Sequence, residues 1–304
     1  MIERVASQLT SFGPYGENHK VLLACSGGAD STFLAYAYKH TAQNHSLPSA
    51  IIAVVDHAQC AASAQNTTLI ADRYRQLGFE VLTQRIQVQQ GLSENELRNH
   101  RYQALCQIAE SVGATQIFVA HHADDQAETV LQRIMRGTGL NGLVGMHPRR
   151  ALAEKFELCR PLLALRSFEM KEYLVKNNIK WHEDASNSDV NYATRNKIRH
   201  EIMPQLAEIS TGDPVKALLK LSSDAASWQE AQQQLLADAG NFAALPSYLR
   251  QQLIRQELLT AKEKVTRQRL QDLEGALLKK GSAVINTSLR FSTSGGKLSV
   301  VARR

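Results

Sequence analysis

Short apolar runs alternate with amphipathic stretches over roughly the first 130 residues of this 304-residue chain. Runs typical of strands lie at Val21–Cys25, Ala50–Val55, Phe79–Ile86 and Gln116–Ala120. Each run is followed by a stretch with helical spacing. The first predicted helix ends near Lys39, and the other three cover Ala64–Leu77, Leu92–Val112 and about Ala123–Arg136. This alternation predicts an α/β fold in which helices cover both faces of a parallel sheet.

The pattern changes at Arg136–Arg150, where four glycines and a proline predict a mobile loop. Beyond the loop we expect a strand at Arg160–Leu165, a helix at Phe168–Asn177 and a basic helix at Thr194–Glu208. A break follows at residues 210–214, where Asp213 precedes Pro214 and is placed to cap the next helix.

Helical spacing resumes after the break and continues to about Leu235. Shorter helices are expected near 247–260 and 266–280, the second of which is stopped by Gly281. Val284–Phe291 and Lys297–Ala302 flank Ser-Thr-Ser-Gly-Gly and predict a closing β-hairpin. We therefore expect two domains, 1–210 and 215–304, and the second is smaller and mostly helical.

The composition is that of an ordinary globular protein, with 43% apolar and 21% charged residues, which excludes collagenous and wholly disordered classes. Four cysteines lie far apart without a CxxC pair, which argues against a disulfide scaffold, a zinc ribbon or a cysteine-held cluster. The N-terminus lacks a signal-peptide pattern, and the longest apolar stretch, residues 50–55, is too short for a membrane span. We expect a cytoplasmic protein that does not contact a membrane.

Positive charge gathers in the C-terminal third of the chain. Residues 1–194 carry 18 basic and 19 acidic side chains, whereas residues 195–304 carry 17 basic and 10 acidic ones. Such asymmetry favours a polyanionic partner such as a nucleic acid, because neutralised phosphates drive that affinity. The alternative is a basic surface that only keeps the protein soluble.

The string SGGADS at 26–31 directly follows the first predicted strand and opens a helix. The first N–H groups of such a helix are unpaired and point at a bound anion, and paired glycines let the backbone approach a phosphate. The candidate phosphate-binding residues are Ser26, Gly27, Gly28, Ala29, Asp30, Ser31 and Thr32. Asp30 would repel a phosphate unless a divalent metal lay between them, which implies Mg²⁺. The alternative, a plain turn with Asp30 as a helix cap, is disfavoured by the length of the string.

Neither GxxxxGK[ST] nor GxGxxG occurs, which disfavours a P-loop and a dinucleotide fold. The string instead resembles the SGGxDS loop of the N-type ATP pyrophosphatases. That resemblance implies ATP, cleaved between its α- and β-phosphates, and an adenine-nucleotide hydrolase-like (Rossmann-like) N-terminal domain.

A second constellation, HHADDQAE at 121–128, closes the fourth predicted strand and opens its helix. Asp125 and Glu128 stand three residues apart, so both carboxylates fall on one helical face. Two close anions need a cation, for which Mg²⁺ or a substrate ammonium would serve. Alternatively, the aspartates only complement the helix dipole and His121 is a hydrogen-bonded residue at the strand end.

Four ordered motifs sharpen the resemblance. Residues 121–146 resemble the signature of the tRNA(Ile)-lysidine synthetases. Glu94, Arg98, Arg101 and Tyr102 fit that family's E-x-x-x-R-x-x-R-Y helix, residues 160–163 its RPLL segment, and residues 181–206 its W-x-E-D-x-S-N…R-N-x-I-R-H block. The loop at 56–60 departs from the family, because it keeps His57 but lacks the usual Gly and Arg. The chain resembles a short form that lacks the last C-terminal domain.

The resemblance implies a ligase that joins L-lysine to C2 of the wobble cytidine of tRNA(Ile) with a CAU anticodon. The cytidine O2 attacks the α-phosphorus of ATP and expels pyrophosphate, and the lysine ε-amine then displaces AMP. By resemblance, Asp125 and Glu128 hold the ammonium, and Asp30 and Asp125 are the candidate metal ligands. Arg195 and Arg199 stabilise the α-phosphate or position the RNA; alternatively they contact phosphates only or form a solvated face. His57 and His121 are candidates for nucleotide binding, although His57 is equally explained as a structural histidine.

The remaining candidate residues face the RNA. Substrate contacts are expected from Arg98, Arg101, Arg136, Arg267 and Arg269. The glycine-rich residues 137–145 would close over a flipped cytidine, or merely form a surface connection. The main rival is a sulfur-inserting tRNA thiolase of the same superfamily, which usually employs paired cysteines or a cluster. An amidotransferase-type synthetase and an RNA-binding module with a relic nucleotide fold are further rivals. A homodimer is compatible with the sequence, but nothing in it demonstrates one.

Overall fold

The computed structural model of the chain describes residues 1–56, 63–86, 94–182, 194–237 and 241–302. Its internal contacts divide the chain into two compact units, Met1–Ser223 and Asp224–Arg304. The division falls within helix α10 (Pro214–Ala237). Each unit is described by itself.

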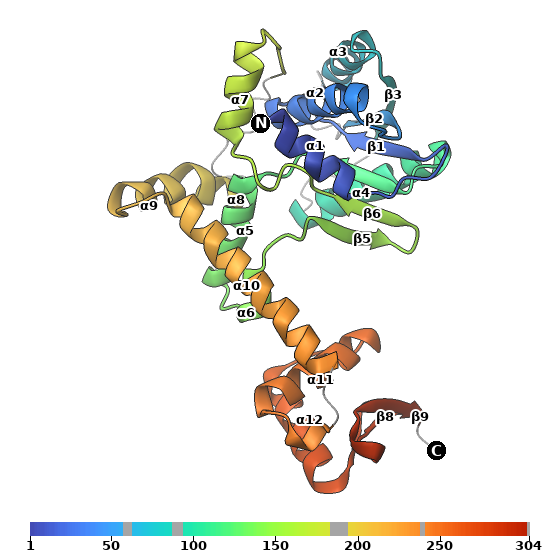
Figure 1. The fold of residues 1–304 in the computed structure, drawn as a ribbon, viewed down its shortest axis with the longest axis vertical. Helices are drawn as coiled ribbons and strands as arrows, with labels where there is room; N and C mark the ends of the chain where they lie inside the picture. The colour runs from blue at the N-terminus through green and yellow to red at the C-terminus, as the bar shows by residue number, and fades with distance from the viewer. Residues whose placement is uncertain (57–62, 87–93, 183–193, 238–240, 303–304) are drawn as a thin grey trace. The chain divides into compact units, whose positions relative to one another are not determined.

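Unit 1 is built on a six-stranded sheet (Figure 1). The spatial order is β3-β2-β1-β4-β6-β5, and every pair is parallel except the antiparallel β5 and β6. The strands are β1 (Lys20–Ala24), β2 (Ser49–Asp56), β3 (Glu80–Arg85), β4 (Gln116–Val119), β5 (Arg149–Ala153) and β6 (Phe156–Cys159). The expected α/β fold with a mainly parallel sheet is confirmed. The four strands predicted in the first 130 residues correspond to β1, β2, β3 and β4, and their ends lie within two residues of the predicted positions.

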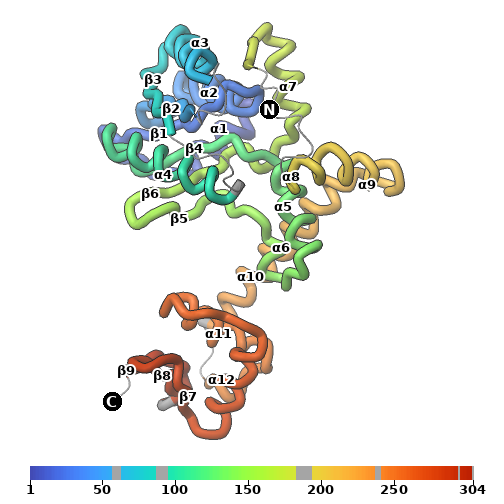
Figure 2. Tube along the Cα trace, turned by 180° about the vertical axis from the view of Figure 1, so that it is seen from behind, coloured from blue at the N-terminus to red at the C-terminus, as the bar shows by residue number. Residues whose placement is uncertain are grey.

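Helices pack on both faces of this sheet: α1 (Ile2–Ser11), α2 (Ala29–Asn44), α3 (Ser63–Gln76) and α7 (Ser167–Lys176) on one face, and α4 (Glu94–Val112) on the other. α5 (Ala123–Met135) and α6 (Leu140–Leu143) are further helices of this unit and pack against each other. Val21 and Leu23 of β1 face a core shared with α1, α2, α3 and α7, whereas Leu22 between them faces the core of α4. α1 and α2 lie in front of the sheet in Figure 1, and α4 lies in front in the reversed view of Figure 2. The alternation of buried side chains along β1 therefore builds two cores.

The predicted basic helix at 194–208 is confirmed, although it is not uniform. It consists of α8 (Thr194–Lys197), a π-helical turn η2 (Ile198–Ile202) and α9 (Met203–Ile209). Asp213 caps α10 as expected, because its Oδ1 accepts the backbone N–H of Val215 at 2.9 Å.

The strand predicted at Arg160–Leu165 is wrong. β6 ends at Cys159, and residues 161–165 form turns, since Pro161 has no N–H for a ladder and Leu165 N donates to Leu162 O at 2.9 Å. The segment predicted as a loop at 136–150 contains secondary structure that was not expected. It contains α6, and the buried Gln126 side chain donates to the carbonyl oxygens of Val144 and Met146 at 2.9 and 3.2 Å.

Unit 2 contains the rest of α10, the short 3₁₀ turn η3 (Phe242–Ala244), α11 (Ser247–Thr260) and α12 (Arg267–Lys280). A three-stranded antiparallel sheet follows, made of β7 (Ser282–Val284), β8 (Leu289–Ser292) and β9 (Ser299–Ala302), with the 3₁₀ turn η4 (Ser294–Gly296) before β9. The two helices and this sheet bury one apolar core around Ile254, Leu258 and Phe291. Gly281 ends α12 with φ +64°, as predicted.

The closing hairpin is confirmed as β8 and β9. The single strand predicted at Val284–Phe291 is broken, because Asn286 Oδ1 accepts the N–H groups of Ser288 and Leu289 at 2.8 Å and turns the chain there. Among the described residues, no helix is long and apolar enough to cross a membrane.

Candidate active site

Two of the predicted motifs meet where the strand order reverses. β1 pairs with β2 on one side and β4 on the other, so the crevice at the carboxyl ends of β1 and β4 is the topological switch point of the sheet. Residues 26–32 follow β1, and residues 121–128 follow β4. The parallel sheet thus brings together two segments that lie about 90 residues apart in the sequence.

The conformation of the loop after β1 is set by a glycine with positive φ and by hydrogen bonds from the loop's own hydroxyl groups. Gly27 has φ +88°, and its carbonyl oxygen accepts the Thr32 hydroxyl at 3.2 Å. Ser31 Oγ donates to Gly28 O at 3.0 Å and lies 3.4 Å from Ser26 Oγ. Gly28 is the N-cap of the 16-residue α2 and, having no side chain, leaves the first N–H groups of the helix without a side-chain cap. The first N–H groups of α2 therefore face the mouth of the loop, as an anion site requires.

The acid helix α5 starts with His122 as its N-cap. The His122 backbone N–H donates to Asp125 Oδ2 at 3.0 Å, and Asp125 and Glu128 follow on one face of the helix. Their side chains are only 10% and 3% exposed. Buried carboxylates require partners, and these come from a distant segment.

The partners are Arg195 and Arg199. Arg195 donates from Nη2 to Asp125 Oδ1 at 2.7 Å and from Nε to Glu128 Oε2 at 2.8 Å. Arg199 donates from Nε to Glu128 Oε1 at 2.6 Å and from Nη2 to Asp125 Oδ1 at 2.8 Å. We call these four side chains the acid–arginine cluster. The sequence predicted Mg²⁺ or a substrate ammonium beside the acid pair, whereas in the structure two guanidinium groups of the chain itself lie there.

A second network joins the acid helix to the loop through His122. Its Nε2 lies 3.5 Å from both Asp30 Oδ2 and Asp125 Oδ2, and its Nδ1 lies 3.4 Å from Asp124 Oδ2. Burial favours the neutral ring, but the carboxylates of Asp124, Asp30 and Asp125 outweigh it and raise the pKa of His122 to about 10. His122 is therefore an imidazolium that lies between Asp30 and Asp125.

The pKa of a carboxylate beside His122 changes in the opposite direction to that of His122 itself. Burial alone would raise the pKa of Asp125, but the positive charges of His122 and Arg195 lower it to about 2. Burial of the neighbouring His121 lowers its pKa to about 3, so this ring is neutral and its Nδ1 accepts a hydrogen bond from Arg160 Nε at 3.2 Å. The two adjacent histidines thus carry different charges.

Several residues of this site were missed by the sequence reasoning. Arg166 donates to Asp124 Oδ1 at 2.8 Å and to Asp213 Oδ2 at 2.6 Å, and Ser167 Oγ donates to Asp30 Oδ1 at 2.9 Å. No local pattern marks these two residues. His122 and Arg160 stand inside quoted motifs, and that position was the signal available for them.

The other predicted site residues are more scattered. Arg98 Nη2 donates to Tyr102 Oη at 3.2 Å on α4, near enough for its charge to lower the pKa of His121. Arg101 is an exposed residue on the same helix, and Arg136 is the exposed C-cap of α5. Arg267 and Arg269 belong to unit 2, and His57 lies outside the described residues.

The donor set fits a magnesium ion at Asp30 better than at Asp125. Within the part of the chain that the structure describes, no group of three or more His, Cys, Asp or Glu side chains is arranged to hold a metal. Mg²⁺ in phosphate sites, however, uses only one or two carboxylates together with the phosphates. The Asp30 side chain is 32% exposed at the loop and its Oδ1 accepts one hydrogen bond, from Ser167, whereas the Asp125 side chain is 10% exposed and both of its oxygens accept hydrogen bonds.

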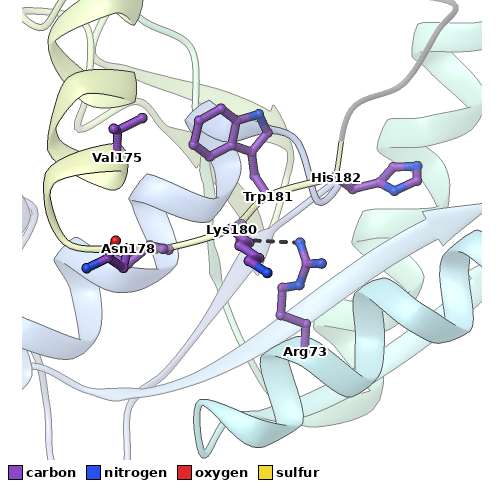
Figure 3. A pocket seen from close by; sticks show the side chains of 7 residues that line it. Arg73, Val175, Asn178, Lys180, Trp181 and His182 are labelled. Carbon is purple, nitrogen blue, oxygen red and sulfur yellow. Dashed lines mark hydrogen bonds between the residues drawn. The ribbon is translucent and has the colours of Figure 1, made fainter.

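An open surface pocket of about 550 Å³ adjoins the phosphate loop, and Figure 3 shows the side chains that line it. It is lined by Arg73, Val175, Asn178, Ile179, Lys180, Trp181 and His182. The loop touches its wall, because His182 N donates to Gly27 O at 2.8 Å. Arg73 and Lys180 are linked within this lining, because Arg73 Nη1 donates a hydrogen bond to Lys180 O at 3.2 Å. Its lining includes three basic side chains and none of the acid–arginine cluster, so it is distinct from the site at the sheet edge.

Comparison with known proteins agrees with the motifs. The chain is 37% identical to a tRNA(Ile)-lysidine synthase of Pseudomonas aeruginosa over 201 aligned residues. This alignment covers 66% of this chain and 44% of that protein. The chain is 36% identical over 208 residues to the tRNA(Ile)-lysidine synthase of Salinispora arenicola, which covers 67% of this chain and 60% of that protein. The resemblance to this group is thereby confirmed. The chain spans about half the length of the curated relatives it matches.

A solved structure supports the fold. The U34-tRNA thiolase NcsA from Methanococcus maripaludis, with its [4Fe-4S] cluster, matches with a TM-score of 0.57 at 16% identity, over 73% of this chain and 78% of that one. This likeness concerns the fold alone. A model of the PP-loop domain matches residues 1–206, which include both motifs at the sheet edge. This match covers more than half of the sequence, and the chain therefore belongs to the PP-loop domain family.

Proposed function

We propose that the chain is an ATP-dependent tRNA(Ile)-lysidine synthetase. It would join the ε-amine of L-lysine to C2 of the wobble cytidine in tRNA(Ile) with a CAU anticodon. The observation that carries the proposal is the junction of the phosphate loop and the acid helix: His122 Nε2 lies 3.5 Å from both Asp30 Oδ2 and Asp125 Oδ2. A nucleotide held at residues 26–32 would then lie beside a site for an amine.

The first step is adenylation. The cytidine O2 attacks the α-phosphorus of ATP, the bond to the β-phosphate oxygen breaks, and pyrophosphate leaves. The N-terminal N–H groups of α2 and the hydroxyl groups of the loop would hold the leaving pyrophosphate by donating hydrogen bonds to it. Mg²⁺, held by Asp30 and the phosphates, supplies charge neutralisation when it is bound. Adenylation turns the cytidine oxygen into a good leaving group.

The second step is substitution by lysine. The ε-ammonium gives one proton to solvent, the resulting amine attacks C2, the C2–O bond breaks, AMP leaves with the cytidine oxygen, and the attacking nitrogen gives a second proton to solvent. Asp125 and Glu128 are the buried carboxylates in this crevice, and we infer that they orient the substrate's ammonium groups. Arg195 or Arg199 would stabilise the charge on the α-phosphate.

The tRNA contacts are assigned by charge. Arg267 is exposed at the start of α12, and unit 2 holds much of the basic surplus of the chain. We propose unit 2 as an RNA-binding domain, because phosphate neutralisation drives such binding. Arg269 is a poor contact residue, since it donates to Lys264 O at 2.7 Å and Ile285 O at 2.7 Å and pairs with Glu263 at 3.0 Å.

A thiolase is not favoured. The relatives with 32–39% identity are tRNA(Ile)-lysidine synthases, whereas the thiolase likeness rests on a fold shared at 16% identity. The described cysteines are also separate: Cys25 and Cys159 are buried, and Cys106 is half-buried on α4.

The proposal is tested by lysine incorporation. The purified chain, ATP, Mg²⁺ and radiolabelled L-lysine are incubated with a tRNA(Ile) carrying CAU or with an isoacceptor that lacks this anticodon. We expect label only in the first tRNA, together with AMP and pyrophosphate. Equal labelling of both tRNAs, or the release of ADP, would contradict the proposal. A variant with Asp30→Asn should lose incorporation, whereas Lys171→Gln, at an exposed position of α7, should retain it.

A further inference from the structure

The carboxylates assigned to the substrate amine are already occupied. Two guanidinium groups donate five hydrogen bonds to Asp125 and Glu128, with lengths from 2.6 to 3.0 Å. Each of the two Glu128 oxygens accepts at least one of them, and Asp125 Oδ1 accepts two. The remaining oxygen, Asp125 Oδ2, accepts the His122 backbone N–H. A cation that enters this site must therefore compete with side chains of the chain itself.

The local charge leads to the same conclusion. Two carboxylates face two guanidinium groups, and the His122 imidazolium lies 3.5 Å from Asp125, so the acid pair carries no unpaired negative charge before any substrate arrives. The carboxylates are 10% and 3% exposed, so water screens little of the repulsion that a third cation would meet there. An ammonium can bind tightly only if one arginine leaves.

Of the two arginines, Arg199 donates three of the five hydrogen bonds, but it is the one nearer to solvent. Its side chain is 38% exposed, against 23% for Arg195. It lies in the π-helical turn η2, and such turns, which occur mostly as single-turn insertions in α-helices, are frequent at functional sites. Asp125, which Arg199 binds, is linked to Asp30 of the phosphate loop through His122, whose Nε2 lies 3.5 Å from both carboxylates.

We propose that Arg199 is an exchangeable occupant of the acid pair: a nucleotide polyphosphate at residues 26–32 attracts its guanidinium, and the vacated carboxylates then take the substrate ammonium. This inference rests on the proposed function, from which it takes the nucleotide and the amine. It adds a rule for the order of binding. The nucleotide prepares the amine site, and by thermodynamic reciprocity the amine tightens nucleotide binding by the same factor.

The exchange is tested by isothermal titration calorimetry of the full chain. L-lysine is titrated with and without Mg²⁺ and α,β-methylene-ATP, which cannot be cleaved between its α- and β-phosphates. We expect the nucleotide to tighten lysine binding by about tenfold, within the usual range of such coupling. Arg199→Gln should bind lysine without nucleotide, and its coupling should fall to less than about threefold. Equal lysine affinity in the wild type with and without nucleotide would overturn the proposal.

Two further variants separate this mechanism from simpler effects. Lys197→Gln removes a positive charge from the adjoining turn, where the side chain is 63% exposed, and it should keep the full coupling. If it lost the coupling as Arg199→Gln does, net charge rather than exchange would be the cause. Arg199→Lys keeps the charge but cannot span both carboxylates as a planar fork, so its coupling should be intermediate. This variant and the wild type decide the question if Arg199→Gln fails to fold.

The outcome is independent of the ligase assay. Incorporation of lysine into tRNA without any coupling would refute the exchange and leave the proposed function intact. Coupled binding without incorporation would refute the proposed function and leave the exchange intact.

Discussion

Gly27→Ala is the substitution whose effect follows most directly from the phosphate loop. Gly27 has φ +88°, a region that residues with a Cβ rarely adopt. A Cβ at this position would lie 2.7 Å from Ile70 Cγ1 and 2.8 Å from Cδ1, much closer than carbon atoms approach each other. The Gly27 carbonyl cannot simply move aside, because it accepts hydrogen bonds from Thr32 Oγ1 and His182 N.

The magnitude is the sum of two terms. A left-handed backbone conformation costs an L-residue about 1–2 kcal/mol. Overpacking against Ile70, which is only 7% exposed, adds about 1–3 kcal/mol. The free energy of unfolding should therefore fall by about 2–5 kcal/mol. Because the loop must shift to relieve the contact, affinity for ATP should fall as well.

The assay is urea unfolding at 25 °C in a Trp228→Phe background, where Trp181 reports unit 1. Ile70→Ala removes the carbon atoms that the new Cβ would strike, so Gly27→Ala and Ile70→Ala should couple favourably by about 1–3 kcal/mol in a double-mutant cycle. Gly16→Ala is the matched control, since its Cβ meets nothing within 4 Å, and its effect should stay within about 0.5 kcal/mol. A wild-type urea midpoint for Gly27→Ala, or strictly additive effects in the cycle, would refute this reasoning.

Three other predictions concern the acid pair, unit 2 and the thiols. Glu128→Gln should lower the free energy of unfolding by up to about 3 kcal/mol, because it removes a buried partner from two arginines, one of which is 38% exposed. The same variant should abolish lysine incorporation. An unchanged urea midpoint together with full incorporation would exclude this role for Glu128. Arg267→Glu should weaken tRNA binding and flatten its dependence on salt in filter-binding assays, and an unchanged salt slope would place the RNA contacts elsewhere. Burial raises the pKa of both Cys25 and Cys159 to about 12, so little thiolate is present below that pH. Neither cysteine should therefore react with iodoacetamide in the native protein at pH 8. Rapid alkylation of either cysteine in the native protein, compared with a urea-unfolded control, would contradict this.

Local motifs predicted the parts of the site that lie close together in the sequence. The strings at 26–31 and 121–128 each combine a strand end with a helix start, and a parallel sheet then brings both to one edge. Asp30, Asp125 and Glu128 could be selected on that basis. The resemblance added Arg195 and Arg199 as candidates, but it did not reveal that they are the partners of the acid pair.

The missed features depend on tertiary contacts. Two adjacent histidines look alike in sequence, and only the fold places His122 among three carboxylates and His121 against Arg160. β5 and β6 were missed because Arg149, Arg150 and Glu157 interrupt the apolar pattern, as polar residues often do near the edge of a sheet. Gln126 was passed over as an ordinary helix residue, although its amide orders the glycine-rich segment through Val144 and Met146.

The most direct measurement follows the α-phosphate of ATP. The chain is mixed with α-³²P-labelled ATP, Mg²⁺ and tRNA(Ile) carrying CAU, first without lysine and then with it. If the loop at 26–31 holds the departing pyrophosphate, the label should first be attached to the tRNA and should be released as AMP when lysine is added. Label recovered as ADP, or a tRNA that stays unlabelled while ATP is consumed, would contradict the account.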